Sequence, residues 1–379
     1  MVFLDNASGT KPFPEVVEVI TDVLTNYWGN SGADYSVGHD AKNLINNATQ
    51  MVARDIGCTS DEIIWTSGAC EANSLAIMGF VNAAPYMRFY TTKLEHASIL
   101  EMVKHGINKT VIFLKNDENG FVDLEDLESK LQEDCDERRS NLVSISFANS
   151  EIGTIQDIKS ISEIVHKYRG ILHVDATQLY PWQQINVKKL GIDMMSVSGQ
   201  KLNCVKGVGF LYVKDGIYLR PLIYGSQQNF RRGGTLPTHL IAAFVTALEI
   251  TRKRNMTSEI SALRDELMGR LTQVKGVHLN GPIGQNYRLP NNISLTIDGV
   301  KAEALMTMCD MFDIAIAKGS ACQSYEAKPS STLTAIGLTD EQALNTVRIS
   351  LGAFNTKEEI DYAADIIGKL IERIREDEE

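Results

Sequence analysis

The sequence lacks a long apolar run, an excess of basic charge and closely spaced cysteines. No apolar stretch approaches the roughly 18–20 residues that cross a membrane, so we expect no membrane contact. No basic region precedes Asp5, which interrupts the apolar start. This pattern argues against a signal peptide and favours the cytoplasm. The formal net charge of −11 disfavours nucleic-acid binding, because binding phosphates needs clustered lysine and arginine.

Six cysteines are scattered along the chain without a Cys-x-x-Cys pair. They are Cys58, Cys70, Cys135, Cys204, Cys309 and Cys322. In a chain of 379 residues, this scatter favours reduced thiols over a disulfide or zinc framework. We therefore expect no bound metal, and a chemical role for one or two of these thiols at most.

Strand-like and helical patterns alternate through the first two-thirds of the chain. We expect a helix from about Glu71 and strands at residues 63–66, 88–91, 111–114, 142–147, 171–174, 194–197 and 210–213. This alternation predicts an α/β fold with a mostly parallel sheet covered on both faces. Ligands of such sheets bind beyond the carboxyl ends of the strands.

The last third of the chain has a different pattern. A long helix begins near Pro237, and a strand of alternating polarity follows at residues 291–297. The final helix opens with a capping box formed by Thr356 and Glu359 and carries one apolar stripe. We therefore expect a large domain and a smaller α+β domain. The large domain would comprise residues 15–250, and the smaller one residues 1–14 and 251–379.

Two neighbouring strand patterns end in the groups that bind pyridoxal phosphate (PLP). Residues 173–175 end in the carboxylate of Asp175, and residues 198–201 end in the amine of Lys201. In PLP enzymes a lysine binds the aldehyde, and an aspartate keeps the pyridine nitrogen protonated. A surface lysine and an aspartate at a strand end would explain the pattern about equally well.

Three further segments suit such a site, and each has an ordinary alternative. Residues 66–71 (Thr-Ser-Gly-Ala-Cys-Glu) open a helix, whose N-terminus either binds a phosphate or forms a simple turn. His96 either stacks on the pyridine ring and shuttles protons, or is a surface or core histidine. The basic turn at residues 231–235 either binds a phosphate or is a solvated loop.

Cys322 and Arg348 indicate how a substrate would be bound and attacked. Cys322 lies in a polar stretch typical of a mobile loop, which suits a nucleophile that travels. Arg348 lies in an apolar strand pattern and needs a partner, either a substrate carboxylate or an internal ion pair. We expect the cysteines at positions 58, 135, 204 and 309 to be structural or incidental.

Together these segments resemble the cysteine desulfurases of the NifS/IscS type, within the class V (fold type I) PLP enzymes. The resemblance covers nearly the whole chain. Its motifs lie at residues 4–7, 66–69, 95–96, 151–153, 173–178, 198–201, 233–237, 319–322 and 348–352. It implies a mostly parallel seven-stranded sheet in the large domain and a catalytic cysteine loop in the small one.

The resemblance also implies roles for single residues. Lys201 would bind the cofactor covalently, and His96 would stack on its ring. Asp175 would pair with the ring nitrogen, and Gln178 with the phenolic oxygen. The phosphate would be held by residues that match or replace the family's ligands: Ser198, Gly68, Ala69, Cys70, Gln200 and, from the other subunit of a homodimer, Thr235.

The same resemblance implies the reaction. Arg348 would bind the carboxylate of L-cysteine, with Ser150 nearby. Cys322 would attack the substrate sulfur, which leaves a persulfide on the enzyme and releases L-alanine. A separate acceptor protein would then take the sulfur. The sequence does not name this acceptor, and iron–sulfur cluster assembly and tRNA thiolation both stay open.

The chain departs from the family pattern at four places. Cys70 replaces a threonine, Ser150 an asparagine and Gln200 a histidine, and residues 29–36 lack the usual proline and histidine. Glutamine still donates a hydrogen bond, whereas a contact of the longer asparagine is lost or bridged by water at Ser150. These changes bear on substrate scope and turnover more than on PLP binding.

Two other functions compete with this interpretation. One is a different class V reaction, such as that of a selenocysteine lyase, transaminase or epimerase; Cys322 argues against a transaminase or epimerase, which needs no thiol. The other is a weakly active sulfur-relay scaffold. The presence of Lys201, Asp175, His96, Cys322 and Arg348 argues against a scaffold.

Overall fold

The structure is a computed structural model that describes residues 1–134, 140–319 and 329–378. The strands are β1 (Val2–Phe3), β2 (Ile63–Thr66), β3 (Met87–Thr91), β4 (Thr110–Phe113), β5 (Ser140–Ser146), β6 (Ile171–Asp175), β7 (Met194–Ser198), β8 (Gly209–Val213), β9 (Val277–Leu279), β10 (Asn292–Ile297), β11 (Ile314–Ala315), β12 (Ala317–Lys318) and β13 (Thr346–Ser350).

The helices lie between these strands and at the C-terminus. They are α1 (Pro14–Asn26), α2 (Ser36–Ile56), α3 (Ala69–Ala83), α4 (Ala97–His105), α5 (Leu124–Glu133), α6 (Ile158–Lys167), α7 (Val187–Leu190), α8 (Thr238–Arg254), α9 (Thr257–Leu271), α10 (Ala302–Met311), α11 (Ser331–Ala335), α12 (Asp340–Leu344) and α13 (Lys357–Glu378). Short 3-10 turns lie at Ser60–Glu62, Gly199–Lys201 and Gln227–Phe230. No helix in the described ranges is long and apolar enough to cross a membrane.

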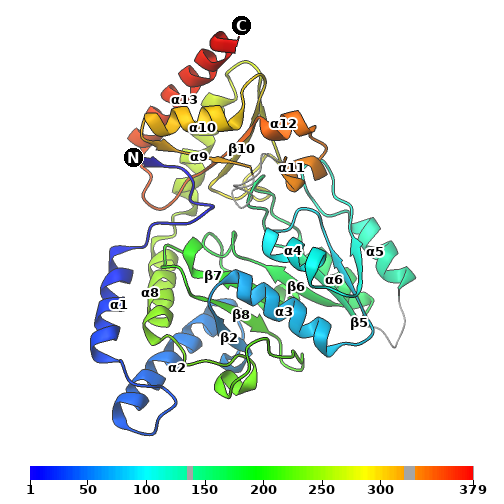
Figure 1. Cartoon of the computed structure of the whole chain (residues 1–379), viewed down its shortest axis with the longest axis vertical. Helices are drawn as coiled ribbons and strands as arrows, with labels where there is room; N and C mark the ends of the chain where they lie inside the picture. The colour runs from blue at the N-terminus through cyan, green and yellow to red at the C-terminus, as the bar shows by residue number, and fades with distance from the viewer. Residues whose placement is uncertain (135–139, 320–328, 379) are drawn as a thin grey trace.

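A seven-stranded sheet forms the centre of the larger part of the molecule (Figure 1). Its strand order is β2-β8-β7-β6-β5-β3-β4. The neighbours from β7 to β4 are parallel, whereas β8 is antiparallel to both β7 and β2. β2 therefore points the same way as the parallel strands. The predicted mostly parallel, seven-stranded sheet is confirmed.

Side chains of successive strand residues enter two different hydrophobic clusters. Ile63 and Trp65 pack in a cluster with residues of α2, α6 and α8, whereas Ile64 packs in another with residues of α3. This division follows from the two-residue period of a strand. Helices consequently cover both faces of the sheet, as a parallel sheet requires.

A second part is built around the antiparallel sheet β12-β13-β10-β9. Its apolar side chains pack with those of α9, α10 and α13 in a separate cluster. β1 pairs with β11, so the N-terminus joins this C-terminal part, next to α13 in Figure 1. The contact agrees with placing residues 1–14 in the smaller domain, and the domain boundaries stay a prediction.

Two predictions for this part of the chain, the capping box of α13 and the alternating polarity of β10, can be compared with the structure. The capping box of α13 is present, because the Thr356 hydroxyl accepts from the Glu359 amide, and the Glu359 carboxylate accepts from the Thr356 amide, each at 3.3 Å. The alternating polarity of β10 does not mark an exposed face, since all of its residues are buried. Its polar side is satisfied by side chains such as Asn280, which donates to Thr296 at 3.0 Å.

Candidate active site

The chemistry-bearing residues gather at one edge of the large sheet. β2, β6 and β7 point the same way, so their last residues, Thr66, Asp175 and Ser198, lie at a common edge. Lys201 follows β7 in a single 3-10 turn, and α3 begins just after β2. This is the edge at which ligands of parallel sheets bind.

Asp175 is held in one orientation at the end of β6. It is 6% exposed. Its Oδ1 accepts from the Thr177 amide at 3.0 Å, and its Oδ2 accepts from Asn73 Nδ2 at 2.8 Å. Two donors on a buried carboxylate lock its plane. The hydroxyl of Thr177 is buried and has no hydrogen-bond partner among the described residues.

Lys201 and Gln178 both contact the N-terminal segment. Lys201 Nζ donates to the Ser8 carbonyl at 2.6 Å, and Gln178 Nε2 donates to the Ala7 carbonyl at 3.1 Å. Residues 7–8 therefore lie at the same sheet edge as Lys201 and Gln178. Residues 4–7 form one of the family motifs, but no function was predicted for this segment.

A close approach of backbones forms a cradle where α3 begins. Gly68 precedes α3 with φ of 147°, a conformation that favours glycine. A Cβ on Gly209 would lie 2.8 Å from Gly68 Cα and 2.4 Å from the Val197 carbonyl oxygen. A Cβ on Gly68 would lie 3.6 Å from Ser198 Oγ. The amides at the start of α3 and the Ser198 hydroxyl thus share one small space that suits a phosphate.

An ion pair borders this cradle. Glu71 accepts from Arg232 Nε at 2.7 Å and from the Ser67 amide at 2.7 Å. Burial acts to raise the pKa of Glu71, but the hydrogen bonds from Arg232 and Ser67 outweigh it, and the pKa lies below its ordinary value. The basic turn at residues 231–235 therefore uses one of its arginines to hold the turn that precedes α3.

His96 is linked to Asp175 through two side chains. Its Nδ1 accepts from the Ser98 amide at 3.1 Å and lies 2.9 Å from Ser98 Oγ. Asn73 Nδ2 donates both to Ser98 Oγ, at 3.0 Å, and to Asp175. Because Nδ1 accepts from an amide, the proton of the neutral imidazole is on Nε2. The sequence motif around His96 and the one around Asp175 thus meet in space.

Glu95 is a buried acid of the motif at residues 95–96, and no role was predicted for it. It is 5% exposed and accepts from Thr92 Oγ1 at 2.8 Å and from Ser146 Oγ at 2.6 Å. Burial raises its pKa to about 7, and the charge of Asp175 adds to the rise. A glutamate beside a histidine is not unusual in sequence, so only its surroundings in the fold mark it.

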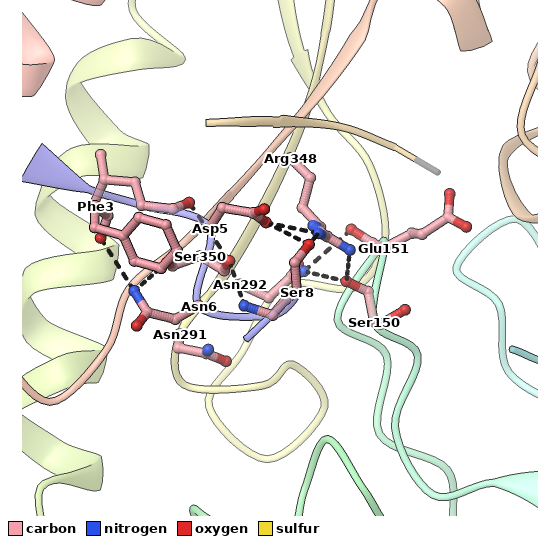
Figure 2. A network of polar contacts seen from close by, with 12 residues as sticks. Phe3, Asp5, Asn6, Ser8, Ser150, Glu151, Asn291, Asn292, Arg348 and Ser350 are labelled. Atoms are coloured by element: carbon pink, nitrogen blue, oxygen red, sulfur yellow. Dashed lines mark hydrogen bonds and ion pairs between the residues drawn. The ribbon is translucent and has the colours of Figure 1, made fainter. Parts of the chain in front are cut away.

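Arg348 points from β13 toward the N-terminal segment (Figure 2). Its Nη2 donates to Asp5 Oδ1 and to Ser8 Oγ, each at 2.7 Å, and its Nη1 donates to the Ser150 carbonyl at 3.4 Å. Its side chain is 4% exposed, and that of Asp5 is 21% exposed. The internal ion pair considered for Arg348 therefore exists, with a partner 343 residues away in sequence.

Glu151 lies on the other side of Arg348 (Figure 2). Its carboxylate accepts from Ser330 Oγ. Burial raises its pKa to about 7, against the opposing effects of the hydrogen bond from Ser330 and of the nearby positive charge of Arg348. Ser150 contributes its backbone carbonyl to Arg348, so the shorter side chain at this position does not remove that contact.

The remaining predicted residues have different positions. Cys70 and Thr235 are exposed. The Gln200 carbonyl accepts from Thr10 Oγ1 at 2.9 Å. Cys322 lies outside the described residues. Thr235 follows Gly234, in the segment that leads into α8, and a contact with a second subunit stays a prediction.

Three of the cysteines expected to be structural are poor nucleophiles. Burial raises the pKa of Cys58, Cys204 and Cys309 to about 12 in each case. The thiolate is the reactive form of cysteine, so these side chains stay protonated near neutral pH. Cys135 lies outside the described residues.

The comparisons with known proteins agree with this geometry. The sequence profile described as aminotransferase class-V matches residues 2–363. The chain belongs to the class-V aminotransferase family. Two similar members are both described as cysteine desulfurase IscS. That of Dictyoglomus turgidum is 36% identical over 383 residues, and that of Clostridium botulinum (strain Hall) is 37% identical over 386 residues. Each alignment covers 99% of this chain and 95% of the relative.

Two solved structures are similar to this class-V family member over nearly the whole chain. A NifS-like protein superposes with a TM-score of 0.90 at 29% identity, covering 98% of this chain and 99% of that one. SspA in complex with cysteine superposes with a TM-score of 0.81 at 29% identity, covering 94% of this chain and 100% of that one. PLP is the cofactor of the family.

The residues of this class-V family member fit PLP. The N-terminus of α3, with the Ser198 hydroxyl 3.6 Å from where a Cβ on Gly68 would lie, suits the phosphate. Asp175 supplies a fixed, buried acid for the ring nitrogen, and Lys201 supplies an amine at the same edge. PLP supplies an electron sink for a bond broken at the amino acid's α-carbon.

Proposed function

We propose that this protein is a PLP-dependent cysteine desulfurase that converts L-cysteine to L-alanine and forms a persulfide on Cys322. The observation that carries the proposal is the bridge made by Ser8, whose carbonyl accepts from Lys201 and whose hydroxyl accepts from Arg348. The amine that would bind the cofactor and the guanidinium that would bind a carboxylate therefore face one short segment. The relatives described as cysteine desulfurases support the same activity.

Each residue then has a task that its surroundings suit. Arg348 binds the substrate carboxylate, since a buried guanidinium favours a planar anion. Lys201 Nζ moves the α-proton. With PLP bound, Asp175 would keep the ring nitrogen protonated, and His96, with its proton on Nε2, would stack on the ring. Gln178 would donate a hydrogen bond to the phenolic oxygen.

The sulfur balance of the reaction is simple. The Cys322 thiolate attacks the sulfur of the bound cysteine, a sulfur–sulfur bond forms, and the carbon–sulfur bond of the substrate breaks. A proton completes the methyl group of alanine, so cysteine and a thiol yield alanine and a persulfide. A separate acceptor protein of the scaffold or tRNA-thiolation type then takes the terminal sulfur. We further propose a cytoplasmic homodimer in which Thr235 binds the phosphate of the partner subunit.

The test is to incubate the purified protein with L-cysteine and a reductant and to measure alanine and sulfide. Cys322→Ala should keep the PLP absorbance and lose sulfide release, whereas the matched control Cys58→Ala should keep both. Normal sulfide release by Cys322→Ala would refute the role of Cys322. A purified protein without PLP absorbance would refute the activity itself.

A further inference from the structure

The three nitrogen atoms of the Arg348 guanidinium differ in how many hydrogen bonds they donate. Nη2 uses both of its hydrogens, one on Asp5 Oδ1 and one on Ser8 Oγ, at 2.7 Å each. Nη1 makes one long contact of 3.4 Å with the Ser150 carbonyl. Nε is buried and has no hydrogen-bond partner among the described residues.

This occupation obstructs a second carboxylate. A guanidinium binds a carboxylate through two parallel N–H groups. The two available pairs are Nη1 with Nη2 and Nε with Nη2, so both pairs include Nη2. A ligand carboxylate therefore binds bidentately only after a present partner leaves Nη2.

Asp5 is the partner that a ligand carboxylate replaces in kind. Of the two acceptors on Nη2, Ser8 offers a neutral hydroxyl, whereas Asp5 offers a carboxylate that is 21% exposed and uses one oxygen, Oδ1, for both Arg348 and Ser8. After it leaves, the Asp5 carboxylate can be hydrated, but a guanidinium as buried as that of Arg348 cannot. Figure 2 shows Asp5 and Ser8 on the same side of the guanidinium.

We propose that Asp5 is an internal carboxylate that occupies the substrate's position on Arg348, and that an amino-acid substrate binds by displacing it. Asp5 then determines specificity, because only a ligand whose own carboxylate replaces it completely binds well. The apparent Kd of the site is the intrinsic Kd divided by the fraction of molecules in which Asp5 does not hold Arg348. This inference rests on the proposed function, in which Arg348 binds the substrate carboxylate.

The test measures binding to the PLP-loaded enzyme by titration calorimetry. The probe is L-alanine, which carries the carboxylate and has no sulfur to transfer; L-alaninamide, which lacks the carboxylate, is the comparison ligand. In Asp5→Asn the Kd for L-alanine should fall on the order of tenfold, with no change for L-alaninamide. Glu18→Gln removes the same charge from an exposed position on α1 and should leave both values unchanged.

Two outcomes overturn the inference. An unchanged Kd would show that Asp5 does not compete, and a raised Kd would show that Asp5 orients Arg348 instead. If Asp5→Asn fails to fold, Asp5→Ala is measured in the same way and must lower the Kd as well. An inference that fails in an enzyme still producing alanine and sulfide leaves the proposed function standing. A wild-type protein that produces neither refutes the proposed function.

Discussion

Replacing Glu95 by glutamine should stabilise the protein in a pH-dependent way. Glu95 is 5% exposed, and burial raises its pKa from 4.5 to about 7, with a further contribution from Asp175. The hydrogen bonds from Ser146 and Thr92 oppose the rise without cancelling it. The folded protein therefore favours the neutral carboxyl, which glutamine resembles in shape and charge.

The sign follows from the two pKa values. Below the unfolded value of 4.5 the group is protonated in both states, and its contribution to stability is fully present. As the pH rises toward about 7, the unfolded chain releases the proton first, so the contribution is lost. Each pKa unit corresponds to about 1.4 kcal/mol, so the wild type should lose about 3 kcal/mol relative to Glu95→Gln over this window.

The measurement is urea unfolding of the two proteins near pH 5, 6, 7 and 8, with PLP bound in both. The difference in the free energy of unfolding should grow in favour of the variant up to about pH 7 and then level off. Glu18→Gln, an exposed glutamate replaced in the same way, serves as the control and should show no such growth. A difference that is constant with pH would refute the raised pKa of Glu95.

Three further outcomes are expected. Gly209→Ala should destabilise the protein by about 1–3 kcal/mol, because its Cβ would lie 2.4 Å from the Val197 carbonyl oxygen. It should also retain less PLP, which is read from the absorbance. An unaltered spectrum and melting temperature would contradict this prediction. Cys204 and Cys309 should react slowly with iodoacetamide near neutral pH, because burial raises the pKa of each thiol to about 12. Rapid labelling of either cysteine, detected by mass spectrometry, would contradict this prediction. Arg348→Lys should raise KM for L-cysteine on the order of tenfold or more, because an ammonium group makes no bidentate contact, and an unchanged KM in the alanine assay would remove Arg348 from substrate binding.

Much of the large sheet was predictable from the sequence. The strands predicted at 63–66, 194–197 and 210–213 appear as Ile63–Thr66, Met194–Ser198 and Gly209–Val213. Such runs are short, apolar and rich in β-branched or aromatic residues, and burial on both faces makes them nearly continuous. The order of motifs also placed Asp175 and Lys201 at one edge, because the ends of neighbouring parallel strands coincide.

The surroundings of single residues were harder to predict from the sequence. Glu95 and Glu151 look like ordinary glutamates in the sequence, and their raised pKa values depend on burial by segments far from them in the chain. The link from His96 to Asp175 passes through Asn73, which no motif singled out. Such contacts join residues that are far apart in the chain, and no periodicity in the sequence predicts them.

The residue pattern alone determined the positions of several strands and the polar residues at their ends, because these depend on residue type and local periodicity. The resemblance to the cysteine desulfurases then named PLP as the cofactor and predicts Cys322 as the nucleophile. Only the tertiary structure decided that Asp5 occupies Arg348 and that Ser8 joins Arg348 to Lys201. The reason is physical: a buried guanidinium takes whichever acceptors the fold brings to it, and here Asp5 and Ser8 lie more than three hundred residues away in the chain.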